Sequence, residues 1–227
     1  VAYAYELAVI IEAGLSRMIG NEENVFYYVT LQNENYAMPP MPADSKEGIL
    51  RGIHRVAETS SPRDKHVQLF GSGSILREVL REREILERYG VSSDIWSVTS
   101  YVELRRDALA AERRARLHPD APAPEPYLER ALGGARGPFI AASDSVKSVP
   151  DLIARWVPGR YVTLGTDGFG MSDTRESLLR HFEVDAENIA VAALVALRLE
   201  GKLSAGEVAR AIRELGVDPE KLDPTSI

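Results

Sequence analysis

The sequence predicts an α/β fold in three layers, built on a mostly parallel sheet. From His66 onward, short apolar runs alternate with longer amphipathic segments, a pattern typical of strands and helices that follow one another in a layered sheet. The composition agrees, because 44% apolar and 27% charged residues are ordinary values for a soluble globular chain. With 227 residues the chain is long enough to bury a full hydrophobic core.

The first 43 residues predict one helix and one strand. Val25–Val29 is a continuous apolar run, which suits a strand buried on both faces. Because one helix and one strand cannot form a domain, we expect residues 1–43 to be the tail and linker of an upstream domain. The chain begins at Val1, inside the helical pattern, so we expect it to be a piece of a larger polypeptide. The apolar positions at helical spacing are Leu7, Ile10, Ile11, Leu15, Met18 and Ile19.

Residues 44–227 predict the second unit. Asp44 or Ser45 should cap a helix that has Ile49, Leu50, Ile53 and Val56 on one face. Near the end of the chain, Ser204 and Glu207 form a capping box for a last helix. Strands are expected over 66–70, 94–98, 139–142 and 161–164, and helices over 75–89, 101–117, 147–156 and 186–199.

A glycine-rich loop follows the strand expected over 161–164. Ser172 or Asp173 should cap the helix after this loop, whose buried face holds Leu178, Leu179 and Phe182. We interpret the loop as a structural corner between strand and helix; a carboxylate site at Asp167 and Asp173 is the alternative.

Bulk composition excludes several classes of function. The chain has no cysteine, which excludes disulfides, thiolate metal sites and cysteine nucleophiles and fits a cytoplasmic protein. Its 27 basic and 34 acidic residues give a net charge of −7, which disfavours nucleic acid as the main partner. No apolar run approaches the ~20 residues of a membrane span.

A polar run directly follows the expected strand Val25–Val29. Ligands in α/β sheets bind outside the carboxyl ends of strands, so this run is a candidate site for a small substrate. A hydrogen-bonded joint between two domains is the alternative. The candidate residues are Leu31, Gln32, Asn33, Asn35 and Tyr36.

Ser72, Gly73 and Ser74 lie between a strand and a helix, where backbone N–H groups can hold an anion. The loop lacks the lysine of a P-loop and the third glycine of a dinucleotide fingerprint. Tight packing between strand and helix is therefore the favoured interpretation, and a small-anion site the alternative.

Scattered histidines and clustered arginines complete the candidate residues. No two of His54, His66, His118 and His181 share a helical face, so neither a metal site nor a Ser/His/Asp triad is expected. Interleaved acidic residues favour a solvated helix face for the arginines, and an interface with an acidic partner is the alternative. These are Arg105, Arg106, Arg113, Arg114 and Arg116.

Three groups of motifs carry a resemblance to a known family. They are GTDGFG at 165–170 with FEVD at 182–185, NENY at 33–36 with two Met-Pro pairs, and VQL with GSGSILR at 67–77. Together they resemble the C-terminal part of the homodimeric bacterial pyruvate dehydrogenases, the decarboxylating, thiamine-diphosphate-dependent first component of the complex. The resemblance covers essentially the whole chain.

The resemblance implies a fold similar to the transketolase C-terminal domain over 44–227, after the end of a pyrimidine-binding domain at 1–43. It implies a homodimer, a lipoyl-bearing acyltransferase partner, and thiamine diphosphate with magnesium held by residues upstream of Val1. The catalytic residues would then also lie upstream, and this fragment alone should be inactive.

Leu31 aligns with a phosphate-binding arginine of transketolases, and an apolar residue there fits pyruvate, which has no phosphate. Two alternatives are a stand-alone anion-binding or scaffold domain and part of another thiamine enzyme. The NENY and FEVD stretches argue against the latter.

Overall fold

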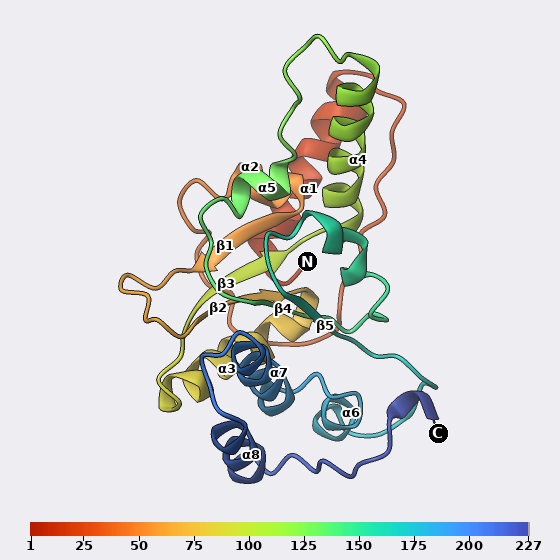
Figure 1. Ribbon diagram of the computed structural model, residues 1–227. Helices are drawn as coiled ribbons and strands as arrows, with labels where there is room; N and C mark the ends of the chain where they lie inside the picture. Colours follow the sequence, from red (N-terminus) through yellow and green to blue (C-terminus); the bar gives the residue numbers. More distant parts are fainter. Residues whose placement is uncertain (227) are drawn as a thin grey trace.

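A computed structural model describes residues 1–226, and a five-stranded sheet lies at its centre (Figure 1). The strand order is β1-β3-β2-β4-β5, and all neighbours are parallel except β1, which runs antiparallel to β3. The predicted mostly parallel α/β sheet is therefore confirmed. The strands are β1 (Ile53–Ala57), β2 (His66–Gly71), β3 (Ser92–Val98), β4 (Phe139–Ala142) and β5 (Tyr161–Leu164).

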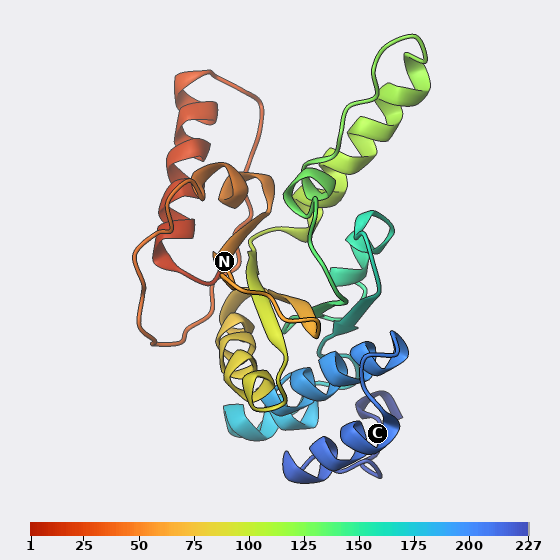
Figure 2. The same ribbon diagram turned by 60° about the vertical axis from the view of Figure 1, so that its left-hand side comes forward.

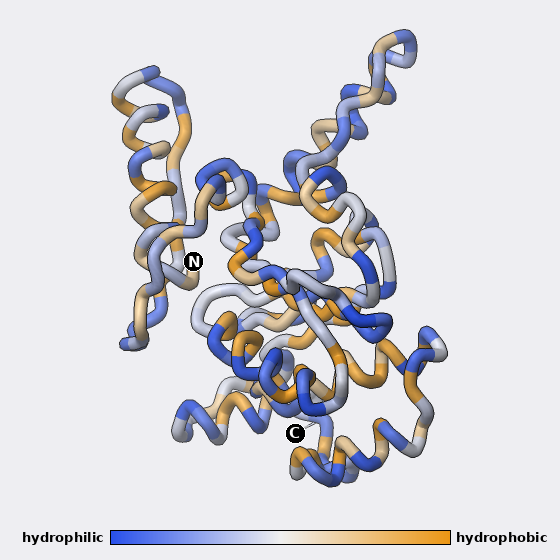
Figure 3. Tube along the Cα trace, turned by 90° about the vertical axis from the view of Figure 1, so that its left-hand side faces the viewer, coloured by the Kyte–Doolittle hydropathy of each residue, from blue (hydrophilic) through white to orange (hydrophobic). Residues whose placement is uncertain are grey.

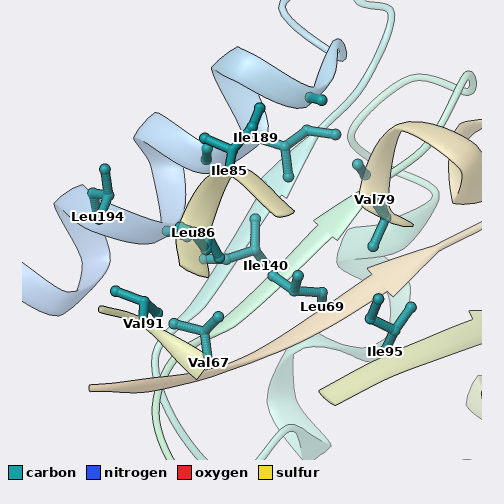
Figure 4. Close-up of a cluster of buried hydrophobic side chains, with 14 of the residues drawn as sticks. Val67, Leu69, Val79, Ile85, Leu86, Val91, Ile95, Ile140, Ile189 and Leu194 are labelled. Atoms are coloured by element: carbon teal, nitrogen blue, oxygen red, sulfur yellow. The ribbon is translucent and has the colours of Figure 1, made fainter. Parts of the chain in front are cut away.

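Helices cover both faces of the sheet, which gives the predicted three layers. One face packs on α3 (Leu76–Arg88) and α7 (Ala186–Leu199), with α8 (Ala205–Glu214) outside them. The other face packs on α4 (Tyr101–Leu117), α5 (Tyr127–Ala131) and the 3₁₀ helix η3 (Pro150–Trp156). Figure 4 shows Leu69, Ile95 and Ile140 of the strands meeting side chains of α3 and α7. Each such buried side chain contributes about 1.5–3 kcal/mol.

The connection from β2 to α3 is packed tightly. A Cβ added at Gly71 would lie 2.7 Å from the Cα of Leu76, so no larger residue fits there. The 3₁₀ turn η2 (Gly73–Ile75) then leads directly into α3. This close approach agrees with the packing interpretation of the loop.

The predicted helix face with Ile49, Leu50, Ile53 and Val56 is wrong in its second half. Helix α2 (Lys46–Arg51) ends at Gly52, whose φ of 111° is a left-handed conformation that favours glycine. Ile53 and Val56 belong instead to β1, which joins the edge of the sheet.

Three further predictions concern helix ends. Residues 147–156 do not form the expected α-helix, and the observed helix η3 is a 3₁₀ helix. It begins only at Pro150, because proline has no N–H to donate inside a helix and is favoured at the first helical position. Helix α6 (Arg175–His181) is capped by Thr174, not by Ser172 or Asp173. The Ser204–Glu207 capping box at α8 is confirmed, and a last 3₁₀ turn, η4, covers Pro224–Ser226.

The first 43 residues form α1 (Ala4–Leu15), a π-turn η1 (Ser16–Gly20) and an extended segment. The predicted strand over Val25–Val29 is wrong for this structure, because these residues pair with no strand and Phe26 and Tyr28 are each 88% exposed. The physical reason is that a strand needs a neighbour for its backbone groups, and none of residues 1–226 supplies one here. An apolar stripe of α1 is exposed as well; it holds Ala4, Ala8, Ile11 and Leu15, and Ile19 of η1 continues it. Figure 3 shows the hydrophobic positions along this helix.

Candidate functional site

The polar run after Val29 is an extended segment whose side chains alternate in direction. Leu31, Asn33 and Asn35 are exposed, with Leu31 at 61%. Gln32, Glu34 and Tyr36 instead bond to other parts of the molecule. This period of two is expected of extended backbone. The five predicted rim residues therefore divide into an outward set (Leu31, Asn33 and Asn35) and an inward, hydrogen-bonded set (Gln32 and Tyr36), of which Gln32 is still exposed.

Gln32 joins the two sites that the sequence predicted separately. Its Oε1 accepts a hydrogen bond from the backbone N–H of Ser74, in the candidate anion loop. Ser72 Oγ donates to Ser143 Oγ at 2.9 Å, which ties the same loop to the end of β4. An anion at the Ser74 amide would have to displace the Gln32 side chain.

Glu34 lies between two arginines from separate helices. Its carboxylate pairs with Arg77 of α3 and, at 3.0 Å, with Nη1 of Arg175, the first residue of α6. Arg175 Nη2 also donates to Ser74 Oγ at 3.0 Å. The Glu34 side chain is 16% exposed, so this ion-pair cluster is largely shielded from water. The sequence analysis missed its role, although Arg77 ends the GSGSILR motif and Arg175 lies between the GTDGFG and FEVD motifs.

Tyr36 fixes the far end of the segment. Its hydroxyl donates to the carbonyl of Ala2, and the Arg77 guanidinium lies 5.1 Å from the centre of its ring. Burial raises the pKa of Tyr36, and the nearby Glu34 carboxylate adds to this. Tyr36 is therefore a neutral hydrogen-bond donor at physiological pH.

A cavity of about 850 Å³ lies at the carboxyl ends of β2, β3 and β4. Residues 25–30 and Gln32 form one wall, and the start of α4 forms the other, between the diverging helices α1 and α4 of Figure 2. Ser72, Gly73 and Ser143 line the floor. Both predicted sites thus reach the position where α/β sheets bind ligands only in part: Gln32 is the one predicted rim residue in the lining, and Ser72 and Gly73 represent the loop.

A buried glutamate connects α1 to the sheet. Glu6 is fully buried and accepts hydrogen bonds from His54 Nε2 of β1 (2.8 Å), Ser97 Oγ of β3 (2.5 Å) and the amides of Ala2 (2.6 Å) and Tyr3 (3.1 Å). Burial alone would raise the pKa of Glu6, but these donors outweigh it and lower the pKa. The carboxylate is therefore charged, and its hydrogen bonds connect the start of the chain to β1 and β3.

His66 is part of a polar network at the start of β2. Its Nδ1 lies 2.8 Å from Ser92 Oγ and its Nε2 lies 3.2 Å from Asp94 Oδ2. Ser92 is buried, and its Oγ also accepts the N–H of Arg63 at 2.9 Å, so it is a packing hub and not an exposed nucleophile. Within residues 1–226, no group of three His, Asp or Glu side chains could hold a metal ion.

The remaining candidate residues have local partners or face solvent. Asp167 Oδ1 accepts the N–H of Lys147 at 3.1 Å, and Asp173 accepts that of Thr174 at 2.6 Å. Arg106 pairs with Glu103 on the same helix. The other four arginines of the α4 cluster are exposed: Arg105, Arg113, Arg114 and Arg116.

Comparison with protein-family models identifies the family of the C-terminal unit. Residues 52–185 match the model of the transketolase-like C-terminal domain, which is more than half of the chain. The chain belongs to the transketolase-like family. Residues 1–39 match the middle domain of the pyruvate dehydrogenase E1 component, so two different domain models meet near the expected linker of the transketolase-like chain.

Relatives with curated names agree with both matches. The transketolase-like chain is 48% identical over 224 residues to the pyruvate dehydrogenase E1 component of Pseudomonas aeruginosa, covering 98% of this chain and 25% of that protein. It is 47% identical over 220 residues to the pyruvate dehydrogenase E1 component of Mycobacterium tuberculosis, covering 96% of this chain and 24% of that protein. The chain thus spans about a quarter of the length of these relatives.

A solved transketolase of Pichia stipitis is 16% identical, with a TM-score of 0.47 over 74% of this chain and 22% of that one. No helix within residues 1–226 is long and apolar enough to cross a membrane.

Proposed function

We propose that this chain is the C-terminal portion of the pyruvate-decarboxylating component of a pyruvate dehydrogenase complex. The observation that carries the proposal is the 48% identity to a pyruvate dehydrogenase E1 component over nearly the whole chain. In the parent enzyme, pyruvate would be decarboxylated and a lipoyl group reductively acetylated. Bound thiamine diphosphate would supply the carbanion chemistry.

The residues of this chain would position the substrate and support the fold of the parent enzyme. We assign thiamine diphosphate and magnesium to residues of the parent enzyme outside this chain, as the family resemblance implies. We further propose a cytoplasmic homodimer whose partner is the lipoyl-bearing acyltransferase. The outward Leu31, Asn33 and Asn35 would form the rim of the substrate channel, with apolar Leu31 suited to a substrate without phosphate.

Residues 1–43 would be the end of a pyrimidine-binding domain, and 44–227 the C-terminal domain. Two observations support this division. The apolar stripe of α1 and the segment Val25–Val29 are both exposed, although their composition suits a core. Both would be buried once the rest of the first domain supplies a sheet.

The test compares the full-length parent protein with this 227-residue chain. With thiamine diphosphate and Mg²⁺, the full-length protein should release CO₂ from pyruvate in the presence of an artificial electron acceptor, while the 227-residue chain should show no turnover. Xylulose 5-phosphate is the control substrate, because a transketolase would use it. Turnover of pyruvate by the short chain alone, or a preference for the sugar phosphate, would overturn the proposal.

A further inference from the structure

Residues 30–36 have no helix or strand to hold them in place. All of them are described, and within this stretch the backbone makes a single internal hydrogen bond, from the N–H of Glu34 to the carbonyl of Gln32 at 3.0 Å. Fixing each such residue costs about 1–2 kcal/mol of backbone entropy. The position of the segment therefore depends on its side chains.

The inward side chains reach separate elements of the C-terminal unit. Gln32 bonds to η2 through the Ser74 amide, while Glu34 bridges α3 and α6 through Arg77 and Arg175. Arg175 closes the cluster, since it also bonds to Ser74 Oγ at 3.0 Å. Helix α6 follows the GTDGFG loop, so Glu34 links the rim to the end of that loop.

Charge makes Glu34 the central member of this cluster. Two guanidinium groups that contact the same carboxylate repel each other, and the shared negative charge offsets this repulsion. The bond from Arg77 is a charge-assisted hydrogen bond, which is stronger than a neutral one, and the contact with Arg175 is an ion pair. Both gain when water is largely excluded, as at the 16%-exposed Glu34 side chain. Gln32 and Tyr36, on either side, make neutral bonds to backbone groups.

We propose that Glu34, held by Arg77 and Arg175, is a positioning residue that fixes Leu31, Asn33 and Asn35 at the channel rim. The role of the rim rests on the function proposed above, whereas the Glu34 clamp itself depends on the geometry of this chain. The two parts can therefore be tested separately.

The clamp is tested by a spin label on the 227-residue chain. Because the chain has no cysteine, Asn33→Cys gives one labelling site on the exposed side of the segment. Glu34→Gln should shorten the rotational correlation time of the label about twofold or more, since the segment loses its ionic anchor. Arg175→Gln should do the same, and the double variant should add little, because both changes remove one cluster.

Glu84→Gln is the matched control: Glu84 lies exposed on α3 and forms no ion pair within residues 1–226. It should leave the label unchanged. Equal mobility of the label in Glu34→Gln and in Glu84→Gln would overturn the clamp.

Kinetics of the full-length protein test the positioning role. Glu34→Gln should raise KM for pyruvate about tenfold with a smaller change in kcat, as expected when a binding contact is misplaced. Glu34→Asp, which keeps the charge, should recover part of the loss. If Glu34 had a purely structural role, Glu34→Gln would lower the folded fraction and leave KM unchanged. That result would overturn the positioning role, even if the spin label at position 33 became more mobile. Absence of pyruvate turnover in the wild type would instead refute the proposed function.

Discussion

Two glutamates are fully shielded from water, and their surroundings affect them in opposite ways. Glu6 receives four hydrogen bonds and its pKa is lowered, with burial alone acting in the other direction. Glu82 lies on α3 with neither carboxyl oxygen bonded to any described residue, and burial raises its pKa well above 4.5. Glu82 is thus a protonated acid in the folded protein at moderately acidic pH, and a destabilising charge at higher pH.

Replacing Glu82 should stabilise the protein. Glu82→Leu keeps a good helix former of similar size and removes the unpaired polar group, so the free energy of unfolding at neutral pH should rise by about 1–3 kcal/mol. Because the folded state binds this proton more tightly, wild-type stability should fall as the pH rises above the ordinary glutamate value of 4.5. The variant should lack this part of the pH dependence.

Urea unfolding at several pH values measures the effect of Glu82→Leu. Glu84→Leu makes the same change at an exposed position of the same helix and should stay within about 0.5 kcal/mol of wild type. A Glu82→Leu variant less stable than wild type at every pH would contradict this account.

Among the elements, four strands were predictable and one was not. The parallel strands β2 to β5 read as short apolar runs in the sequence, because helices cover both faces of the sheet. The spacing of Ile49, Leu50, Ile53 and Val56 fits a helix equally well, so periodicity alone could not separate α2 from β1. The break depends on Gly52, whose left-handed backbone is set by contacts with distant residues.

Gly52→Ala should test this break. A Cβ at Gly52 would lie 2.6 Å from the carbonyl oxygen of Ser100 and 2.8 Å from Leu104 Cγ, in addition to the unfavourable φ. The free energy of unfolding should fall by about 2–3 kcal/mol. Gly90→Ala is the matched control, since Gly90 also has positive φ (72°) but no atom within 4 Å of an added Cβ. Gly90→Ala should lower the free energy of unfolding by about 1 kcal/mol, from the backbone strain alone. Thermal unfolding measures both variants, and equal losses of stability would refute the steric explanation.

The candidate site was only partly predictable for a related reason. The sequence shows the polar run and the Ser72–Ser74 loop as separate stretches, and extended spacing could have sorted Leu31 from Gln32. The bond between Gln32 and Ser74 spans 42 positions and joins two irregular segments, so no periodic pattern in the sequence predicts it. Glu34 likewise meets Arg175 only because the sheet brings η2, α3 and α6 together.

At the scale of the whole molecule, the first 43 residues attach to the C-terminal unit through both polar and apolar side chains. Glu6 makes the deepest of these connections, to His54 and Ser97 in two neighbouring strands. The exposed apolar stripe of α1 faces away from this attachment. The joint therefore combines specific hydrogen bonds with apolar packing, since Ala2 and Tyr3 are buried in the same hydrophobic cluster as Leu69 of β2.

Glu6→Gln should loosen this joint. A neutral amide would turn an N–H group toward at least one of the four donors, and the free energy of unfolding should fall by about 2 kcal/mol or more. The lowered pKa means that Glu6 stabilises the fold above 4.5 and that this stability is lost as the pH falls through the folded-state pKa. The variant should therefore be less sensitive to acid than the wild type.

Chemical unfolding at pH 7 and at acidic pH measures both effects of Glu6→Gln. Glu12→Gln, on the exposed side of α1 and paired with Lys46 at 2.8 Å, should change stability by less than about 0.5 kcal/mol. If the two variants lost equal stability, the buried network would not be the connection described.

The anchors of the polar segment impose an order on biosynthesis. Gln32 and Glu34 precede all three of their partners, Ser74, Arg77 and Arg175, and the last of these begins a helix late in the sequence. A ribosome releases residues from the N-terminus onward, so Gln32 and Glu34 emerge long before the residues that hold them. The wall that borders the cavity consequently completes its anchoring late, and a nascent chain stopped before α6 would lack the Arg175 half of the Glu34 cluster.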